Sequence, residues 1–213
     1  MINRLILIAI PASVALALVA SQVASQGPVV QSDYPSWRWP APDPARGEQL
    51  AQVCSTCHAA SSAQVNPPAP KLLHQRQSYL FFALRAYRGG ERESDLMAPF
   101  ASDLSDQDMR DIAAYQAGDM LDRPPPVRTD SPAYPRTINE CISCHGETGI
   151  GEFEAMPVLT GQDAAYLETA LSEYRSGKRG NPTMRAIASG LSDADIVAFA
   201  EYYAAHEWLE HRP

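Results

Sequence analysis

Cys54-Ser55-Thr56-Cys57-His58 and Cys141-Ile142-Ser143-Cys144-His145 are two copies of the Cys-x-x-Cys-His pattern, which is typical of covalently attached c-type haem. Each thiol of such a motif adds across a vinyl group of the porphyrin, and the adjacent histidine binds the iron. One copy alone could arise by chance or be a zinc or redox pair, but these two use all four cysteines of the chain. The sequence therefore predicts two haem c groups, with His58 and His145 as iron ligands.

The two motifs lie 87 residues apart, and the same offset recurs along the chain. Residues 54–117 match residues 141–204 without a gap, with 24 identities in 64 positions. The matched pairs include Pro70 with Pro157, Gln75 with Gln162, Tyr79 with Tyr166, Arg88 with Arg175 and Met97 with Met184. This regularity indicates an internal duplication and two tandem domains of one fold.

The pattern of helix signals is the same in both repeats. Asp43 and Pro44 supply an N-cap and a first-turn proline for a helix that we expect to end at the first haem motif. Apolar residues at helical spacing follow Tyr79, and Gly89-Gly90 should end that run. Ser105 and Ser192 each begin a capping-box pattern. No segment shows strand alternation, so the predicted fold class is all-α.

The N-terminus has the features of an export signal. Arg4 precedes an apolar run from Leu5 to Ala20, and small residues before Gln26 suit cleavage. The run is short for a membrane span of about 20 residues, although a retained N-terminal anchor is the alternative. We expect a protein exported to the periplasm, where c-type haem is attached.

The boundaries of the segments and domains are predicted from changes in amino-acid composition along the chain. The predicted segments are a signal peptide or anchor at 1–25, a proline- and aromatic-rich segment with Trp37 and Trp39 at 26–42, a first domain at 43–120, a proline-rich linker at 121–136 and a second domain at 137–213. Beyond residue 25 the chain has 25 acidic and 16 basic side chains, a net charge of about −9. This acidity argues against nucleic acid as a partner. It favours either docking to a basic protein surface or ordinary solubility.

The repeat also selects candidates for the sixth iron ligand. Among the six methionines only Met97 and Met184 align with each other, and each lies 39 residues after its haem histidine. We therefore predict His58/Met97 and His145/Met184 coordination. A thioether opposite histidine favours ferrous iron and leaves no open position for oxygen or substrate. The pattern indicates an electron carrier and no catalytic residues.

The sequence also repeats tyrosines and arginines and contains three histidines outside the haem motifs. The repeated tyrosines are expected in the core beside haem. Arg88 and Arg175 could either bind haem propionates or lie on a solvated helix face. His74, His206 and His211 are not expected to bind iron, and a solvated position is the simplest account of the last two.

These residues together give a strong resemblance to dihaem cytochromes of the cytochrome c4 type, over roughly residues 43–207. The resemblance implies two class I cytochrome c domains related by a pseudo-twofold axis, each wrapped around one covalent haem, with the propionates facing each other near the interface. It also implies that the carbonyls of Pro70 and Pro157 hold the proximal imidazoles. The long N-terminal segment and the longer linker depart from the family pattern.

The family resemblance implies single-electron transfer between redox proteins. The donor would be a membrane quinol-oxidising complex or a dehydrogenase, and the acceptor a haem–copper terminal oxidase. The alternative is a cytochrome subunit of a periplasmic dehydrogenase complex, such as flavocytochrome c sulfide dehydrogenase. A dihaem enzyme is a third class. It is disfavoured by the two matched methionines and by the absence of a fifth cysteine that could serve as an active-site ligand.

Overall fold

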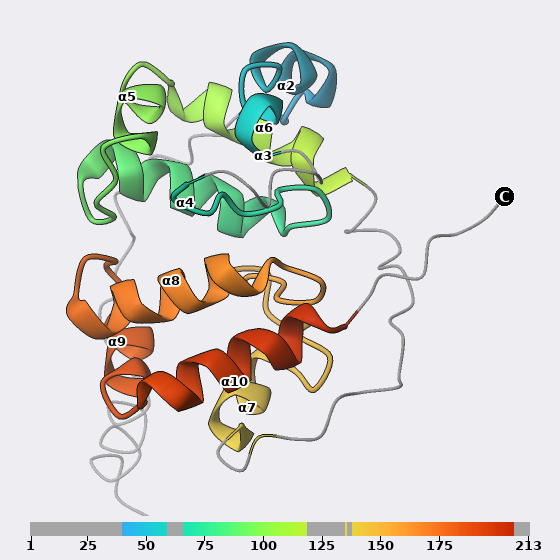
Figure 1. Cartoon of the computed structure of the whole chain (residues 1–213). Helices are drawn as coiled ribbons and strands as arrows, with labels where there is room; N and C mark the ends of the chain where they lie inside the picture. Colours follow the sequence, from blue (N-terminus) through green and yellow to red (C-terminus); the bar gives the residue numbers. More distant parts are fainter. Residues whose placement is uncertain (1–39, 59–65, 119–134, 136–137, 207–213) are drawn as a thin grey trace, which may run out of the picture. The chain divides into compact units, whose positions relative to one another are not determined.

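The computed structural model describes residues 40–58, 66–118, 135 and 138–206. The predicted signal segment, Trp37, Trp39, His211 and nearly all of the predicted linker lie outside the described residues. The first repeat contains α2 (Pro44–Leu50), α3 (Ser55–His58), α4 (Gln77–Gly89), α5 (Met97–Ser102) and α6 (Asp106–Ala117) (Figure 1). The second contains α7 (Asn139–His145), α8 (Ala164–Ser176), α9 (Pro182–Ala188) and α10 (Asp193–Ala204).

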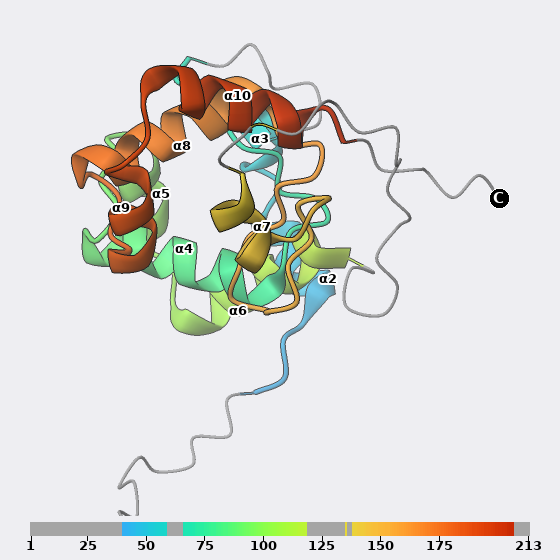
Figure 2. The ribbon, with the colours of Figure 1, turned by 90° about the horizontal axis from the view of Figure 1, so that it is seen from below.

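The helices obey the sequence repeat closely. Helix α8 covers the positions of α4 advanced by 87 residues, and α10 stands in the same relation to α6. In both halves the long helix packs against the last one and against the short helix between them, as α4 does with α6 and α5 and as α8 does with α10 and α9 (Figures 1 and 2). Among the described residues the only extended pairing is an isolated bridge, so the predicted all-α class is correct.

Local signals explain where these helices begin and end. Asp43 caps α2 by accepting hydrogen bonds from the N–H groups of Ala45 and Arg46. Both predicted capping boxes are present, at Ser105 for α6 and at Ser192 for α10. Helix α4 ends at Gly89 and is followed by the C-cap Gly90, whose φ of 81° lies in the left-handed region that glycine adopts without strain. In contrast to our expectation, α2 ends at Leu50, and a turn separates it from the haem motif.

In the first half, α2 packs closely against α6. A Cβ atom at Gly47 would lie 2.0 Å from the backbone oxygen of Asp111, so only glycine permits this approach. Asp111 accepts hydrogen bonds from Asp43 N–H, Gln107 and Arg46, and its side chain is 1 % exposed. The repeat places Ala198 at the equivalent position, so the second half lacks this carboxylate.

Each half has its own small apolar core. Met109, Ile112 and Ala113 of α6 are buried in the first half, and Phe199, Tyr202 and Tyr203 of α10 are buried in the second. Met109, whose repeat partner is Ile196, is fully buried in α6. Within the residues that the structure describes, no helix is both long and apolar enough to cross a bilayer.

Candidate haem sites

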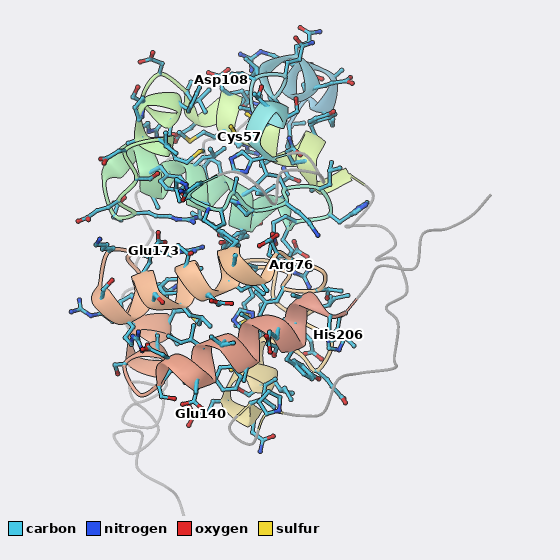
Figure 3. The ribbon with its side chains drawn as sticks, viewed as in Figure 1. Cys57, Arg76, Asp108, Glu140, Glu173 and His206 are labelled. Atoms are coloured by element: carbon cyan, nitrogen blue, oxygen red, sulfur yellow. The ribbon has the colours of Figure 1, made fainter. Side chains whose placement is uncertain are left out.

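The first haem motif is carried by α3 and the turn before it. Cys54, Cys57 and His58 occupy one helical turn, in which His58 N–H donates to the carbonyl of Cys54 at 2.9 Å (Cys57 is labelled in Figure 3). His58 Nδ1 lies 2.8 Å from the carbonyl oxygen of Pro70. A carbonyl oxygen can only accept, so Nδ1 carries the proton. The neutral ring then has its lone pair at Nε2, the atom left for iron.

The second motif repeats this arrangement on α7. Cys141, Cys144 and His145 lie on this single helix, and His145 Nδ1 is 3.4 Å from the carbonyl oxygen of Pro157. The proline contacts implied by the family resemblance are therefore present in both halves, although the second is longer. None of the four cysteines forms a disulfide. Two thiols beside an oriented imidazole make each motif a suitable haem c attachment site.

Burial keeps both histidines in the form that binds a metal. The pKa of His58 is lowered by its burial, an effect that the Pro70 carbonyl partly offsets. Burial likewise lowers the pKa of His145, which is 8 % exposed. The imidazoles are therefore neutral at neutral pH. Burial also raises the pKa of Cys141 to about 11, with Glu140 adding to this effect.

The two aligned methionines are positioned by equivalent local contacts. Met97 N–H donates to Ser94 Oγ at 3.1 Å, and Met184 N–H donates to Asn181 Oδ1 at 3.0 Å. Ser94 and Asn181 are themselves 87 residues apart, so a side chain at one repeat position accepts a hydrogen bond from the methionine N–H in both halves. Both methionine side chains are partly exposed, unlike Met109. Their ligation of iron remains a prediction.

Arg88 and Arg175 have a structural role that the sequence analysis did not foresee. Arg88 donates to the carbonyl of Leu104 and pairs with Asp106 at the start of α6. Arg175 makes the equivalent contacts with Leu191 and Asp193 at the start of α10. These arginines thus tie each long helix to the last helix of its half. Their carboxylate partners account for both charges without a propionate.

The remaining histidines differ partly from expectation. His206, which is labelled in Figure 3, is 1 % exposed, and its Nδ1 donates to the carbonyl of Tyr202 at 2.9 Å. The predicted solvated position is therefore wrong. Its ring also packs edge-on against the Tyr202 ring. His74 has a positive φ of 61° and its N–H donates to the carbonyl of Gln116.

Contacts between the two halves come in pairs related by the same offset. The buried side chain of Gln75 bonds both backbone groups of Val158, with N–H···O distances of 2.7 and 3.0 Å. Gln162 bonds both backbone groups of Lys71, at 2.9 and 3.0 Å. Val158 is the repeat partner of Lys71, as Gln162 is of Gln75. Such reciprocal pairs are what a pseudo-twofold arrangement of the halves requires.

A second set of reciprocal contacts surrounds two buried arginines. Arg92 and Arg179 pair as an isolated antiparallel bridge, flanked by hydrogen bonds from Glu93 N–H to Lys178 O and from Gly180 N–H to Glu91 O. Each guanidinium reaches a tyrosine hydroxyl of the other half, Arg92 that of Tyr166 and Arg179 that of Tyr79. The sequence analysis did not single out these arginines. The signal was present, since they are identical at the 87-residue offset.

The polar groups of this cluster fit a cofactor that brings carboxylates. Arg92 Nε is buried and has no hydrogen-bond partner. Among the described residues, no aspartate or glutamate forms an ion pair with either arginine. Haem c carries two propionates, which could supply such an acceptor. The residues of both halves therefore suit haem at its attachment motif.

Family models match both halves. Residues 44–116 match the model described as cytochrome c, and residues 136–202 match the model described as cytochrome c oxidase, cbb3-type, subunit III. These two ranges contain the first and the second haem motif, respectively.

Curated relatives match over most of the chain. Cytochrome c4 of Pseudomonas aeruginosa is 34% identical over 183 residues, which cover 76% of this chain and 88% of the relative. The thiosulfate dehydrogenase electron acceptor of Stutzerimonas stutzeri is 34% identical over 170 residues, which cover 72% and 79%. Among solved structures, reduced cytochrome c4 from Pseudomonas stutzeri aligns with a TM-score of 0.60 at 30% identity, covering 78% of this chain and 100% of that one.

A thiosulfate dehydrogenase from Marichromatium purpuratum aligns with a TM-score of 0.64 at 25% identity, over 77% of this chain and 40% of that chain. The combined matches to cytochrome c4 extend through both motifs and both helical repeats. The chain belongs to the cytochrome c4 family, as a dihaem electron-transfer cytochrome with two covalently bound haem c groups.

Proposed function

We propose that this chain is a periplasmic carrier that passes single electrons between respiratory proteins, with iron ligands His58 and Met97 in one half and His145 and Met184 in the other. The observation that carries the proposal is the equivalent placement of the two methionines. Each occupies the same repeat position, and each donates its backbone N–H to a side-chain oxygen three residues earlier. A shared role as iron ligand explains this equivalent placement better than two unrelated positions in the apolar core.

The side chains of the protein keep reorganisation small. The bound haem supplies a one-electron iron couple, and a thioether ligand raises its potential. Pro70 and Pro157 hold the imidazole rings through Nδ1, which fixes their tautomer and orientation. A methionine held from its own helix would keep the sixth position closed in both oxidation states. The halves thus favour electron transfer over substrate binding at iron.

Donor and acceptor are proposed from chemistry and from the relatives. A quinol-oxidising complex or a dehydrogenase would supply electrons, and a haem–copper terminal oxidase would accept them. The predicted export signal at residues 1–25 supports a periplasmic location, either soluble or held at the outer face of the inner membrane by a retained anchor.

A second candidate function is supported by two of the relatives. The proteins from Stutzerimonas stutzeri and Thiomonas intermedia, 34% and 31% identical, are described as thiosulfate dehydrogenase electron acceptors. The alternative of a cytochrome subunit in a dehydrogenase complex therefore gains a specific form. In it the chain accepts electrons from a thiosulfate-oxidising partner, in place of the flavocytochrome c sulfide dehydrogenase considered from sequence.

The first test is a spectroelectrochemical titration of the purified holoprotein. Two low-spin haems with the thioether-to-ferric charge-transfer band and positive midpoint potentials are expected. A high-spin haem, or rapid carbon monoxide binding to either reduced iron, would refute six-coordinate ligation at that site.

A second test separates the carrier from the subunit. The tagged holoprotein is expressed in its own host and isolated without detergent and at low salt. Recovery as a single chain that is reduced in solution by added dehydrogenase and substrate supports the carrier. A stable stoichiometric complex with a dehydrogenase supports the subunit.

A further inference from the structure

Arg76 of the first half binds a loop of the second half. This loop, residues 146–156, directly follows the second haem motif. Arg76, which is labelled in Figure 3, donates from Nη1 to Glu154 Oε1 at 2.7 Å and from Nη2 to the carbonyl oxygen of Gly151. Its side chain is 13 % exposed. A mostly buried guanidinium therefore holds the loop through two of its nitrogens.

The residue that Arg76 holds lies against the haem motif itself. A Cβ atom at Gly151 would lie 2.3 Å from the carbonyl oxygen of Cys144 and 3.4 Å from His145 Cα. At Gly146 the same atom would lie 2.7 Å from the carbonyl oxygen of Ile150, so the loop folds back closely on its own start. Because the packing is this tight, a displacement of Gly151 would uncover or move Cys144 and His145.

Arg76 stands where its own helix would favour a different residue. It is the N-cap of α4, and its side chain makes no capping hydrogen bond. The repeat partner, Asp163, caps α8 by accepting a hydrogen bond from Tyr166 N–H at 3.3 Å. A short acidic side chain suits a helix N-terminus, whereas the helix dipole opposes a cation there. The first half thus lacks a local stabilising contact at a position whose side chain serves the second half.

The residue types at the equivalent positions do not allow the reverse contact. Moving by 87 residues places Asp163 at the position of Arg76 and Pro67 at the position of Glu154. Asp163 is used as a helix cap, and a proline side chain has no charge to pair with an arginine. This contact therefore differs from the reciprocal glutamine contacts, because it acts from the first half on the second alone.

We propose that Arg76 is a positioning residue for the second haem, the one attached through the motif on α7. By holding the 146–156 loop against Cys144 and His145, it makes the midpoint potential of that haem depend on the contact between the halves. Arg76 acts through the loop backbone and keeps water from the proximal side of the site. The inference rests on the second haem c group, and it applies equally to a free carrier and to a subunit of a complex.

The test measures both midpoint potentials in holoprotein that contains Arg76→Gln. Loss of a nearby cation and entry of water beside the proximal histidine both favour ferric iron. The potential of the second haem should therefore become more negative, and its shift should exceed that of the first haem. Haem methyl signals in the NMR spectrum assign each potential to its haem. Equal shifts of both haems, which loss of charge alone would give, or an unshifted second haem would overturn the proposal.

Arg76→Lys separates the loop contact from the charge. Lysine keeps the positive charge but has a single nitrogen in place of the planar fork, so it cannot reproduce both bonds to the loop. The first haem should keep its wild-type potential, and the second should lie between wild type and Arg76→Gln. A second potential equal to that of wild type would show that only the charge matters, which contradicts the positioning role.

Hydrogen exchange reports the loop directly in the same variants. In the loop, Gly149 N–H donates to the carbonyl of Gly146 at 3.2 Å, and Met156 N–H donates to that of Phe153 at 3.0 Å. Losing a hydrogen bond to a charged group should make these amides exchange faster by roughly tenfold or more. Met109 N–H in α6 should exchange as in wild type. Faster exchange spread evenly over both halves would indicate general destabilisation and contradict the proposal.

Two further variants serve as controls. Arg76→Asp copies Asp163 and can cap α4, so poor folding of the first half would not explain its effects. It should still open the loop and lower the second potential, and wild-type exchange in the loop would overturn the proposal. Arg88→Gln removes an arginine that is paired with Asp106 inside the first half, and it should leave the loop and the second potential unchanged.

Discussion

Gln75 and Gln162 occupy the same position in the two repeats, and each bonds both backbone groups of one residue in the opposite half. A side-chain amide has a donor and an acceptor side by side, so it can bond both the N–H and the C=O of one residue, as a neighbouring β-strand would. Both side chains are buried, at 5 % and 6 % exposure. The halves are therefore joined by directional contacts as well as by the linker.

Truncating one of these amides should loosen the contact between the halves. Gln75→Ala leaves the buried N–H and C=O of Val158 without partners, at a cost of about 1–3 kcal/mol for each unpaired group. We expect faster hydrogen exchange at Val158 N–H and a lower unfolding midpoint in denaturant. Gln107→Ala, which removes an amide bonded within the first half, serves as the control. Unchanged exchange at Val158 would contradict the assigned role.

Removing either predicted methionine ligand should alter one haem and spare the other. Met97→Ala and Met184→Ala should each lower the potential of one iron by a sizeable part of the roughly 0.8 V range that axial ligands span. The altered haem should become high-spin and bind carbon monoxide when reduced. Met109→Leu, a conservative change at a buried methionine, should leave both spectra unaltered. Two unchanged potentials in the alanine variants would show that the ligand assignment is wrong.

Acid should remove a stabilising contribution of Asp111 in the first half. Although burial raises it, hydrogen bonds from Asp43 N–H, Arg46 and Gln107 hold the pKa of Asp111 below its usual value. A carboxylate with a depressed folded-state pKa stabilises the protein at neutral pH. That contribution is lost as pH falls below about 4, the unfolded value, through the folded-state pKa.

Asp111→Ala imitates Ala198 of the second half and should remove this pH dependence. We expect the variant to be less stable than wild type at pH 7, with the difference shrinking as the pH falls below about 4. Urea unfolding between pH 7 and 3, followed by far-ultraviolet circular dichroism, measures it. A stability difference that stayed constant with pH would contradict the electrostatic account.

Partner reduction should depend on salt. The polypeptide beyond residue 25 has a net charge of about −9, from 25 acidic and 16 basic side chains. Exposed charges more than about 10 Å apart are screened at 0.1 M salt. The second-order rate constant with a basic redox partner, followed by stopped-flow, should therefore fall as ionic strength rises. A rate independent of salt would mean that the acidity serves solubility and not docking.

Much of the fold was predictable because its determinants are local or repeated. Helices α4 and α8 are each followed by a C-cap glycine with positive φ, and both capping boxes form from residues three apart. The predicted end of α2 was wrong. The start of this helix is set by a local signal, Asp43, whereas its end depends on the turn that leads into Cys54.

The sequence by itself determined the two attachment motifs, the duplication and the methionine pair, because covalent haem chemistry demands fixed residue types at fixed spacing. Only the tertiary structure showed that Arg88 and Arg175 brace helix ends while Arg92 and Arg179 meet at the contact between the halves. All four are arginines conserved between the repeats, so the sequence pattern treats them alike. The two pairs of arginines differ in burial and in whether a carboxylate lies close enough to pair with them. Both properties depend on residues far away in the chain.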